Sequence, residues 1–142
     1  MENVAHISGS QTSSRLGRSV GAVLAGLLTV VVTHTGTDAI LHASGVFPAA
    51  GQVMTDALFV LATSYRVLFT VLGGYVTARL APSRPLKHAL VLGSIGSVLA
   101  LAGMLATLGR GPEFGPLWYP LALVVTALPS CWLGGRWSLP SK

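Results

Sequence analysis

Four long apolar runs, separated by short polar connections, dominate this chain of 142 residues. They cover about residues 20–41, 57–78, 89–108 and 117–133. A helix needs roughly 20 apolar residues to cross the hydrocarbon core of a bilayer. We therefore predict an all-α, polytopic membrane protein folded as an up-down bundle of four transmembrane helices.

The composition excludes the main water-soluble classes. Charged residues make up 9% of the chain, against about 25% in an ordinary soluble domain. Disordered and collagen-like chains are excluded as well, because half of the residues are hydrophobic and no Gly-X-Y repeat is present. The net charge of +5 does not indicate nucleic-acid binding, since the basic residues are spread between apolar runs and form no patch with aromatics.

The chain divides into three segments. Residues 1–14 are polar and small, and we expect a disordered cytoplasmic tail there. Residues 15–137 form the transmembrane domain, and 138–142 form a short cytoplasmic tail. The first run becomes polar after His34, so its outer end is open. Pro129 within the fourth run leaves the carbonyl of Val125 without a helical donor, which predicts a bend there.

The basic residues predict the orientation. With the N-terminus inside, only Arg110 falls outside, and seven basic residues fall on the cytoplasmic side: Arg15, Arg18, Arg79, Arg84, Lys87, Arg136 and Lys142. Lys and Arg accumulate in cytoplasmic loops. We therefore expect both termini in the cytoplasm. A cleaved signal peptide is an alternative for the first run, but the run is long for one and no clear cleavage site follows.

Small and polar residues recur at helical spacing along each run. Helices in lipid associate through such residues, because they let backbones approach closely. The four stripes predict a shared interior, with Leu and Val facing lipid. They are Ala22, Gly26, Thr29, Thr33 and Thr37; Thr63, Arg66, Thr70, Gly73 and Thr77; Gly93, Gly96, Ala100, Gly103 and Thr107; and Ala122, Thr126, Ser130 and Gly134.

Arg66 lies near the middle of the second run, where a charged side chain costs about 2.5 to 3.5 kcal/mol to insert. It therefore needs a partner. His34 and Asp38 lie four residues apart on one face of the first run and meet this need. We predict an intramembrane polar cluster of Arg66, Asp38 and His34, with Thr63 and Thr70 completing its hydrogen bonds.

Three roles for this cluster are open. It can clamp the first two helices together, it can line a solute pathway, or it can face another subunit. A metal site is not expected, because ligands at positions 34, 38 and 42 of one helix are spread over about 12 Å. No haem ligand pair, phosphate loop or catalytic constellation is recognisable, so we expect neither a cofactor nor an enzymatic activity.

A further set of short motifs carries a resemblance. They are Tyr65-Arg66, Gly73-Gly74-Tyr75, Ala78-Arg79-Leu80-Ala81-Pro82, Gly45-Val46-Phe47-Pro48 and Trp118-Tyr119-Pro120. In these the chain resembles uncharacterised small bacterial inner-membrane proteins with four spans, a group that brings no known activity. The resemblance implies that the chain is a multi-pass protein of a bacterial inner membrane. Small multidrug transporters are similar in size, but they carry an acidic residue within the first helix. This chain has only uncharged residues from Val20 up to His34 there.

Two functions follow as expectations. The leading one is a non-enzymatic accessory or interaction module whose partners are the bilayer and other copies or other membrane subunits. The alternative is a small oligomeric transporter or channel in which Arg66 lines the solute pathway. A membrane enzyme acting on lipid has only the outer His and Asp residues in its favour.

Overall fold

The protein is described by a computed structural model, which places the backbone of residues 2–49 and 51–140 and the side chains of residues 15–49 and 51–140. Four helices make up the fold: α1 (Glu2–Ala43), α2 (Asp56–Leu80), α3 (Pro85–Thr107) and α4 (Trp118–Trp137), with a short 3-10 turn, η1 (Pro112–Phe114), before α4. No strand occurs in the described part of the chain. Each of the four is long and apolar enough to cross a membrane.

The helices exceed the apolar runs at most ends. Helix α1 begins at Glu2, so the backbone is helical from there on in the segment 1–14, where the sequence predicts a disordered tail. That segment contains one glycine and no proline, and extending an existing helix needs no new nucleation. Apolar content predicts where a helix meets lipid, but not where the helix ends.

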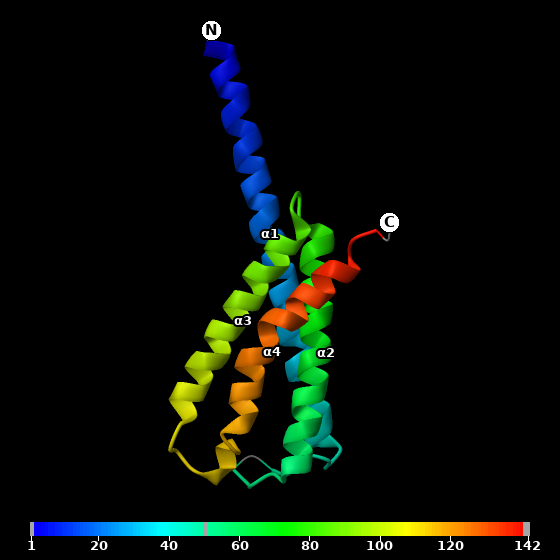
Figure 1. Ribbon diagram of the computed structural model, residues 1–142, viewed down its shortest axis with the longest axis vertical. Helices are drawn as coiled ribbons and strands as arrows, with labels where there is room; N and C mark the ends of the chain where they lie inside the picture. Colours follow the sequence, from blue (N-terminus) through cyan, green and yellow to red (C-terminus); the bar gives the residue numbers. More distant parts are fainter. Residues whose placement is uncertain (1, 50, 141–142) are drawn as a thin grey trace.

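The connection between α2 and α3 is a tight turn. Ala81 is extended because it precedes Pro82, and the helical conformation is disfavoured before proline. Pro85 occupies the first turn of α3, where its missing N–H has no helical partner to lose. Figure 1 shows this turn near one end of the helices, and the α1–α2 and α3–α4 connections at the other end.

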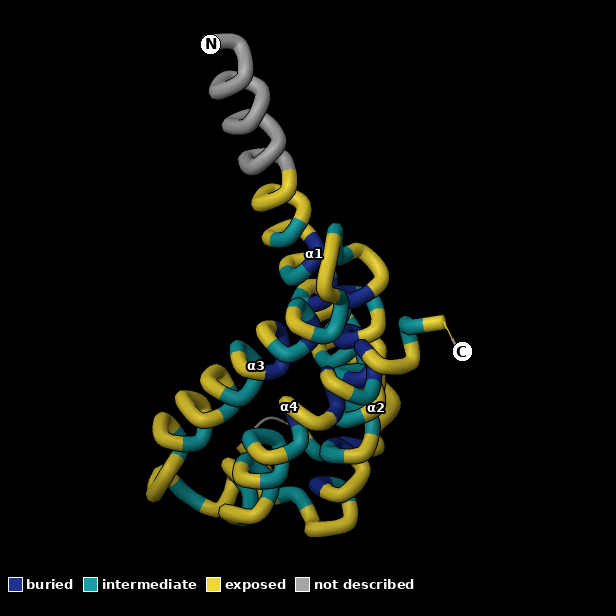
Figure 2. Tube along the Cα trace, turned by 45° about the horizontal axis from the view of Figure 1, so that its top comes forward, coloured by how far each residue is buried: buried dark blue, intermediate teal, exposed yellow. Residues whose placement is uncertain are grey.

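Helix α2 lies at the centre of the packing. It packs extensively against α1 and α4, while α3 packs mainly against α4. Most of the buried positions are small, with Phe47, Phe59 and Leu92 as large exceptions, and the small ones include Ala22, Ala62, Thr77, Ala78, Ala89, Ala127 and Cys131. Large side chains such as Leu24, Leu28 and Leu68 are exposed. Figure 2 shows the same division, with buried positions concentrated where the helices cross.

Glycines allow the helices to approach closely where they cross. A Cβ atom on Gly26 of α1 would lie 2.7 Å from the carbonyl oxygen of Gly73 in α2. One on Gly93 of α3 would lie 3.0 Å from the Cα atom of Leu128 in α4. The distance at Gly26 is too short for a real Cβ atom, and the one at Gly93 would require the neighbouring backbone to shift, so the missing Cβ atoms allow both close approaches.

The predicted small-residue stripe of α3 is packed along only part of its length. Gly93 and Gly96 face α4, whereas Gly103 has nothing within 4 Å of its Cβ position and Thr107 is only half-buried. Figure 1 shows the second half of α3 leaning away from α2 and α4. The prediction of a shared interior along the whole of this stripe is therefore wrong for its last two turns. A ten-residue connection, with η1 inside it, spans the distance between the end of α3 and the start of α4.

Helix α4 contains Pro129 in its interior. The proline has no N–H for the carbonyl of Val125, and its ring displaces the preceding turn. Figure 1 shows α4 changing direction part-way along its length. The bend turns the last part of α4 across α2.

Candidate functional site

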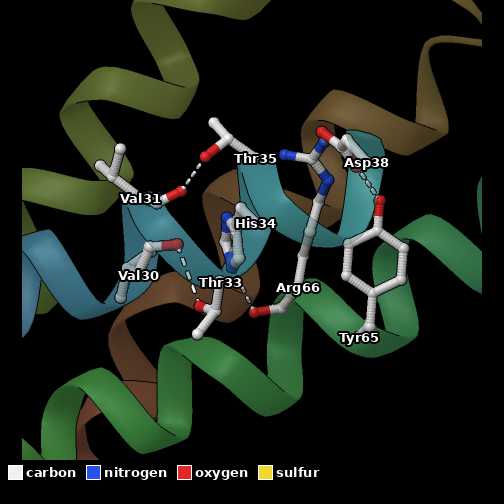
Figure 3. A network of polar contacts seen from close by, with 8 residues as sticks. All are labelled: Val30, Val31, Thr33, His34, Thr35, Asp38, Tyr65 and Arg66. Carbon is white, nitrogen blue, oxygen red and sulfur yellow. Dashed lines mark hydrogen bonds and ion pairs between the residues drawn. The ribbon is translucent and has the colours of Figure 1, made fainter. Parts of the chain in front are cut away.

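Arg66 and Asp38 form an ion pair between α2 and α1. The Arg66 Nη2 atom donates to the Asp38 Oδ2 atom at 2.5 Å, as Figure 3 shows. Asp38 lies five residues before the end of α1 and Arg66 lies ten residues after the start of α2. The guanidinium therefore extends toward the loop end of the helices to reach the carboxylate, as long basic side chains do within membranes.

Tyr65 is the second partner of Asp38. Its hydroxyl donates to Asp38 Oδ1, so each carboxylate oxygen accepts one hydrogen bond from α2. The Arg66 Cζ atom also lies 5.8 Å from the centroid of the Tyr65 ring, within the range of a cation–π contact. One acidic side chain of α1 is thus held by two consecutive residues of α2.

His34 contributes through the backbone of α2. Its Nε2 atom lies 3.1 Å from the carbonyl oxygen of Arg66. Because a carbonyl oxygen only accepts, Nε2 carries the hydrogen and donates it. The Thr70 hydroxyl donates to the same carbonyl at 2.7 Å. Asp38, Tyr65, Arg66 and His34 are called the polar cluster below.

The two threonines predicted to complete the cluster behave differently from that prediction. Thr63 donates its hydroxyl to Phe59 O at 2.8 Å, within its own helix. Thr70 touches the cluster only through the Arg66 carbonyl. A threonine hydroxyl on a helix reaches the carbonyl four residues back without any rearrangement. It therefore makes its hydrogen bond within its own helix rather than to a neighbouring one.

Sequence reasoning missed Tyr65 as a member. Adjacent residues on a helix project about 100° apart, so a search for residues on the face of Arg66 does not select its neighbour. Asp38 is met by both because it projects between the two side-chain directions. The available signal was the pairing of a phenol and a guanidinium next to each other in an apolar run.

The electrostatics of the cluster are those of a neutral unit. Arg66 and Asp38 cancel each other's formal charge, and their side chains are only 23% and 29% exposed. The Arg66 Nε atom is buried and has no hydrogen-bond partner. Pairing is therefore the main way in which the cluster offsets the cost of a charge within the membrane. The pair joins α1 to α2 toward the end of the helices where the α1–α2 connection lies.

A cavity of about 280 Å³ adjoins the cluster. All four helices contribute to its wall. Arg66 and His34 line it on the side of the polar cluster, and Val31, Leu99 and Leu123 are among its apolar lining residues. The arrangement places an apolar chamber next to a charged but neutralised pair.

No group of three or more His, Cys, Asp or Glu side chains close enough to bind a metal ion occurs among the described residues. The single cysteine, Cys131, lies on α4 and is buried, with its sulfur 3.8 Å from the carbonyl oxygen of Thr70 in α2. Its surroundings are those of a small packing residue.

Comparison of the chain with models of protein families, with curated proteins and with solved structures finds no match.

Proposed function

We propose that the chain is a multi-pass protein of the bacterial inner membrane that serves as a non-enzymatic accessory or interaction module. The observation that carries the proposal is how the polar cluster is used. Both carboxylate oxygens of Asp38 bond to α2, and the His34 ring bonds to the α2 backbone. Side chains whose hydrogen bonds are made between α1 and α2 stabilise this helix pair.

The surface of α1 supports a role in association. Gly17, Gly21 and Gly36 have nothing within 4 Å of their Cβ positions. Gly17 and Gly21 form a Gly-x-x-x-Gly spacing, which is typical of contacts between membrane helices. The partner in this proposal is a second copy of the chain or another membrane subunit.

The proposal includes an up-down crossing with both termini in the cytoplasm. Its support is the distribution of charge over the two ends of the helices. Arg110 lies in the α3–α4 connection, at the end opposite to the α2–α3 turn that carries Arg84. An excess of Lys and Arg is expected in cytoplasmic segments. The proposal also includes a relationship to the small four-span bacterial inner-membrane proteins that the chain resembles.

The test is the size of the protein extracted from its own membrane in a mild detergent. We expect a species larger than the monomer. Gly21→Leu fills the open face of α1 and should reduce that species to the monomer. Gly103→Leu, also at an open glycine but on α3, serves as the matched control and should leave the size unchanged. A wild-type protein that is monomeric under these conditions contradicts the association role.

A small carrier or channel is a second candidate, which the lining of the cavity by Arg66 and His34 favours. Its test compares solute uptake into vesicles that contain wild-type protein with vesicles that contain the double variant Arg66→Leu, Asp38→Leu. The double variant removes the pair without leaving a lone charge. Loss of uptake with the fold intact supports a carrier; unchanged uptake, or no uptake by either protein, contradicts it.

A further inference from the structure

The cavity between the four helices is large enough for a small apolar molecule. Its volume is about 280 Å³, and a dry engineered cavity of about 150 Å³ binds benzene. Aliphatic and small residues form most of its wall, among them Leu27, Val67, Leu92, Gly96 and Ala100. Such a wall gains dispersion contacts when an apolar ligand fills it.

The cavity meets the lipid-facing surface of the protein. Val31 of α1 and Leu99 of α3 both line it, and they are 47% and 57% exposed. Both side chains thus belong to the cavity wall and to the outer surface. A molecule dissolved in the bilayer can reach the cavity between these two helices without crossing water.

The polar groups of the wall other than Arg66 already use their hydrogens, whereas the Nε–H of Arg66 is buried without a partner. His34 and Thr70 donate to the Arg66 carbonyl, Thr126 donates to Ala122 O at 2.6 Å, and the Cys131 thiol points to Thr70 O. Each hydroxyl oxygen and the second imidazole nitrogen keep a lone pair. The wall therefore offers acceptors and one unpartnered donor, and a ligand hydroxyl, which can both donate and accept, matches them.

The charges of the wall disfavour an ionic ligand. The positive charge of Arg66 is paired with Asp38, so a carboxylate in the cavity would compete with Asp38 and leave a net negative charge in the membrane. A cationic head group would find no unpaired carboxylate. Both ions are costly at this depth.

We propose that this cavity binds a neutral lipid-soluble molecule, an aliphatic chain or ring that carries a hydroxyl group, taken up from the bilayer between α1 and α3. The inference concerns a ligand site. It holds whether or not the chain also acts as an accessory module, because it depends on the cavity and not on the open face of α1.

Photo-cross-linking in vesicles tests the proposal. Wild-type protein is reconstituted in vesicles of phosphatidylethanolamine and phosphatidylglycerol, with decanol that carries a diazirine in its chain, and labelled residues are mapped by mass spectrometry. We expect concentrated labelling at Leu27, Val67 and Ala100. Excess unmodified decanol should reduce this labelling several-fold, whereas decanoate and decyltrimethylammonium should not. Lipid-facing Leu68 and Leu105, which are 65% and 61% exposed, provide the background that no competitor changes.

A substitution that fills the cavity provides a second test, with a matched control on the same helix. A Cβ atom on Gly96 would meet only the Ala127 Cβ atom, at an ordinary 3.6 Å. The Cβ atom of Gly96→Leu therefore meets no backbone, and the leucine side chain is expected to occupy part of the cavity that Gly96 lines. It should lose the competable labelling, while Gly103→Leu on the same helix should keep it. Ala100→Leu is the second filling variant if Gly96→Leu does not fold.

Three results would overturn the proposal. They are labelling spread evenly over the exposed residues, competition by decanoate or decyltrimethylammonium as strong as that by decanol, and competable labelling that survives in a folded cavity-filled variant.

Discussion

Gly74 of α2 lies so close to Cys131 of α4 that a Cβ atom added to Gly74 would stand 2.7 Å from the Cα atom of Cys131. The clash is with backbone, which cannot rotate away as a side chain can. Gly74→Ala must therefore push the two helices apart or bend them. This crossing is central, because α2 and α4 form one of the most extensive helix pairs in the protein.

We expect Gly74→Ala to lower the free energy of unfolding by about 1 to 3 kcal/mol, the usual cost of overpacking. The measurement is the midpoint of unfolding in mixtures of mild detergent and sodium dodecyl sulfate. Gly103→Ala is the control, because nothing lies within 4 Å of its Cβ position and alanine favours a helix over glycine. Equal midpoints for the two variants would show that α2 and α4 do not cross at Gly74.

Removing one partner of the Arg66–Asp38 pair should cost more than removing both. Asp38→Asn leaves the Arg66 charge unpaired within the membrane. We expect a loss of stability below the roughly 3 to 5 kcal/mol of a fully buried pair, since both side chains are about a quarter exposed. The double variant Asp38→Leu, Arg66→Leu should recover much of that loss, because it leaves no charge behind.

A double-mutant cycle over these two positions measures the coupling. A clamp between α1 and α2 predicts a clear coupling energy between Asp38 and Arg66. Strictly additive losses would mean that the two side chains are not paired in the membrane.

Tyr65→Phe tests the second hydrogen bond to Asp38. The variant keeps the ring and removes only the hydroxyl that donates to Asp38 Oδ1. We expect a loss of about 0.5 to 1.5 kcal/mol, the net value of one hydrogen bond, and a smaller effect in an Asp38→Asn background. Tyr75→Phe, at an exposed position on the same helix, should change the unfolding midpoint little. An effect of Tyr65→Phe that is the same with and without the Asp38 carboxylate would argue against the contact.

The four helices could be predicted from the sequence because hydrophobic length alone decides whether a segment can cross a bilayer. The pairing of Asp38 with Arg66 could also be proposed, since a charge near the middle of an apolar run needs a partner. Hydrogen-bond partners could not be predicted in the same way. Thr63 and Tyr65 both have a hydroxyl, but only the relative rotation of α1 and α2 decides that Tyr65 reaches Asp38 while Thr63 bonds to its own helix.

The cavity was beyond sequence reasoning for a similar reason. Gly96 and Gly103 are equivalent in a periodic pattern, being two helical turns apart on α3. In the fold, Gly96 lines the cavity beside α4 and Gly103 faces open space. The divergence of α3 from α4 separates their roles, and the spacing of the stripe does not encode that divergence.

Cysteine labelling tests the proposed orientation. In a Cys131→Ala background, Ser44→Cys places a thiol in the α1–α2 connection and Ser83→Cys places one in the α2–α3 turn, and both positions are exposed. A maleimide that cannot cross the membrane, added to intact cells, should modify the cysteine at position 44 and leave that at position 83 unmodified. The reverse pattern would place both termini outside, against the distribution of Lys and Arg.

We expect a substitution at Thr77 to stabilise the protein. Its side chain is completely buried, facing Gly26 where α1 crosses α2, and its Oγ1 atom has no hydrogen-bond partner. A buried hydroxyl without a partner carries a cost of about 1 to 3 kcal/mol. Valine has nearly the same shape, so Thr77→Val should keep the packing against Gly26, remove that cost and raise the unfolding midpoint.

Thr29 provides the matched control on α1. Its hydroxyl donates to Ala25 O at 2.8 Å, so Thr29→Val removes a hydrogen bond that is made and should lower the midpoint slightly or leave it unchanged. A stabilising Thr77→Val beside a neutral or destabilising Thr29→Val is the expected pair of results. If Thr77→Val lowers the midpoint as much as or more than Thr29→Val does, the Thr77 hydroxyl has a partner in the membrane, and the α1–α2 crossing depends on that hydrogen bond as well as on the glycines.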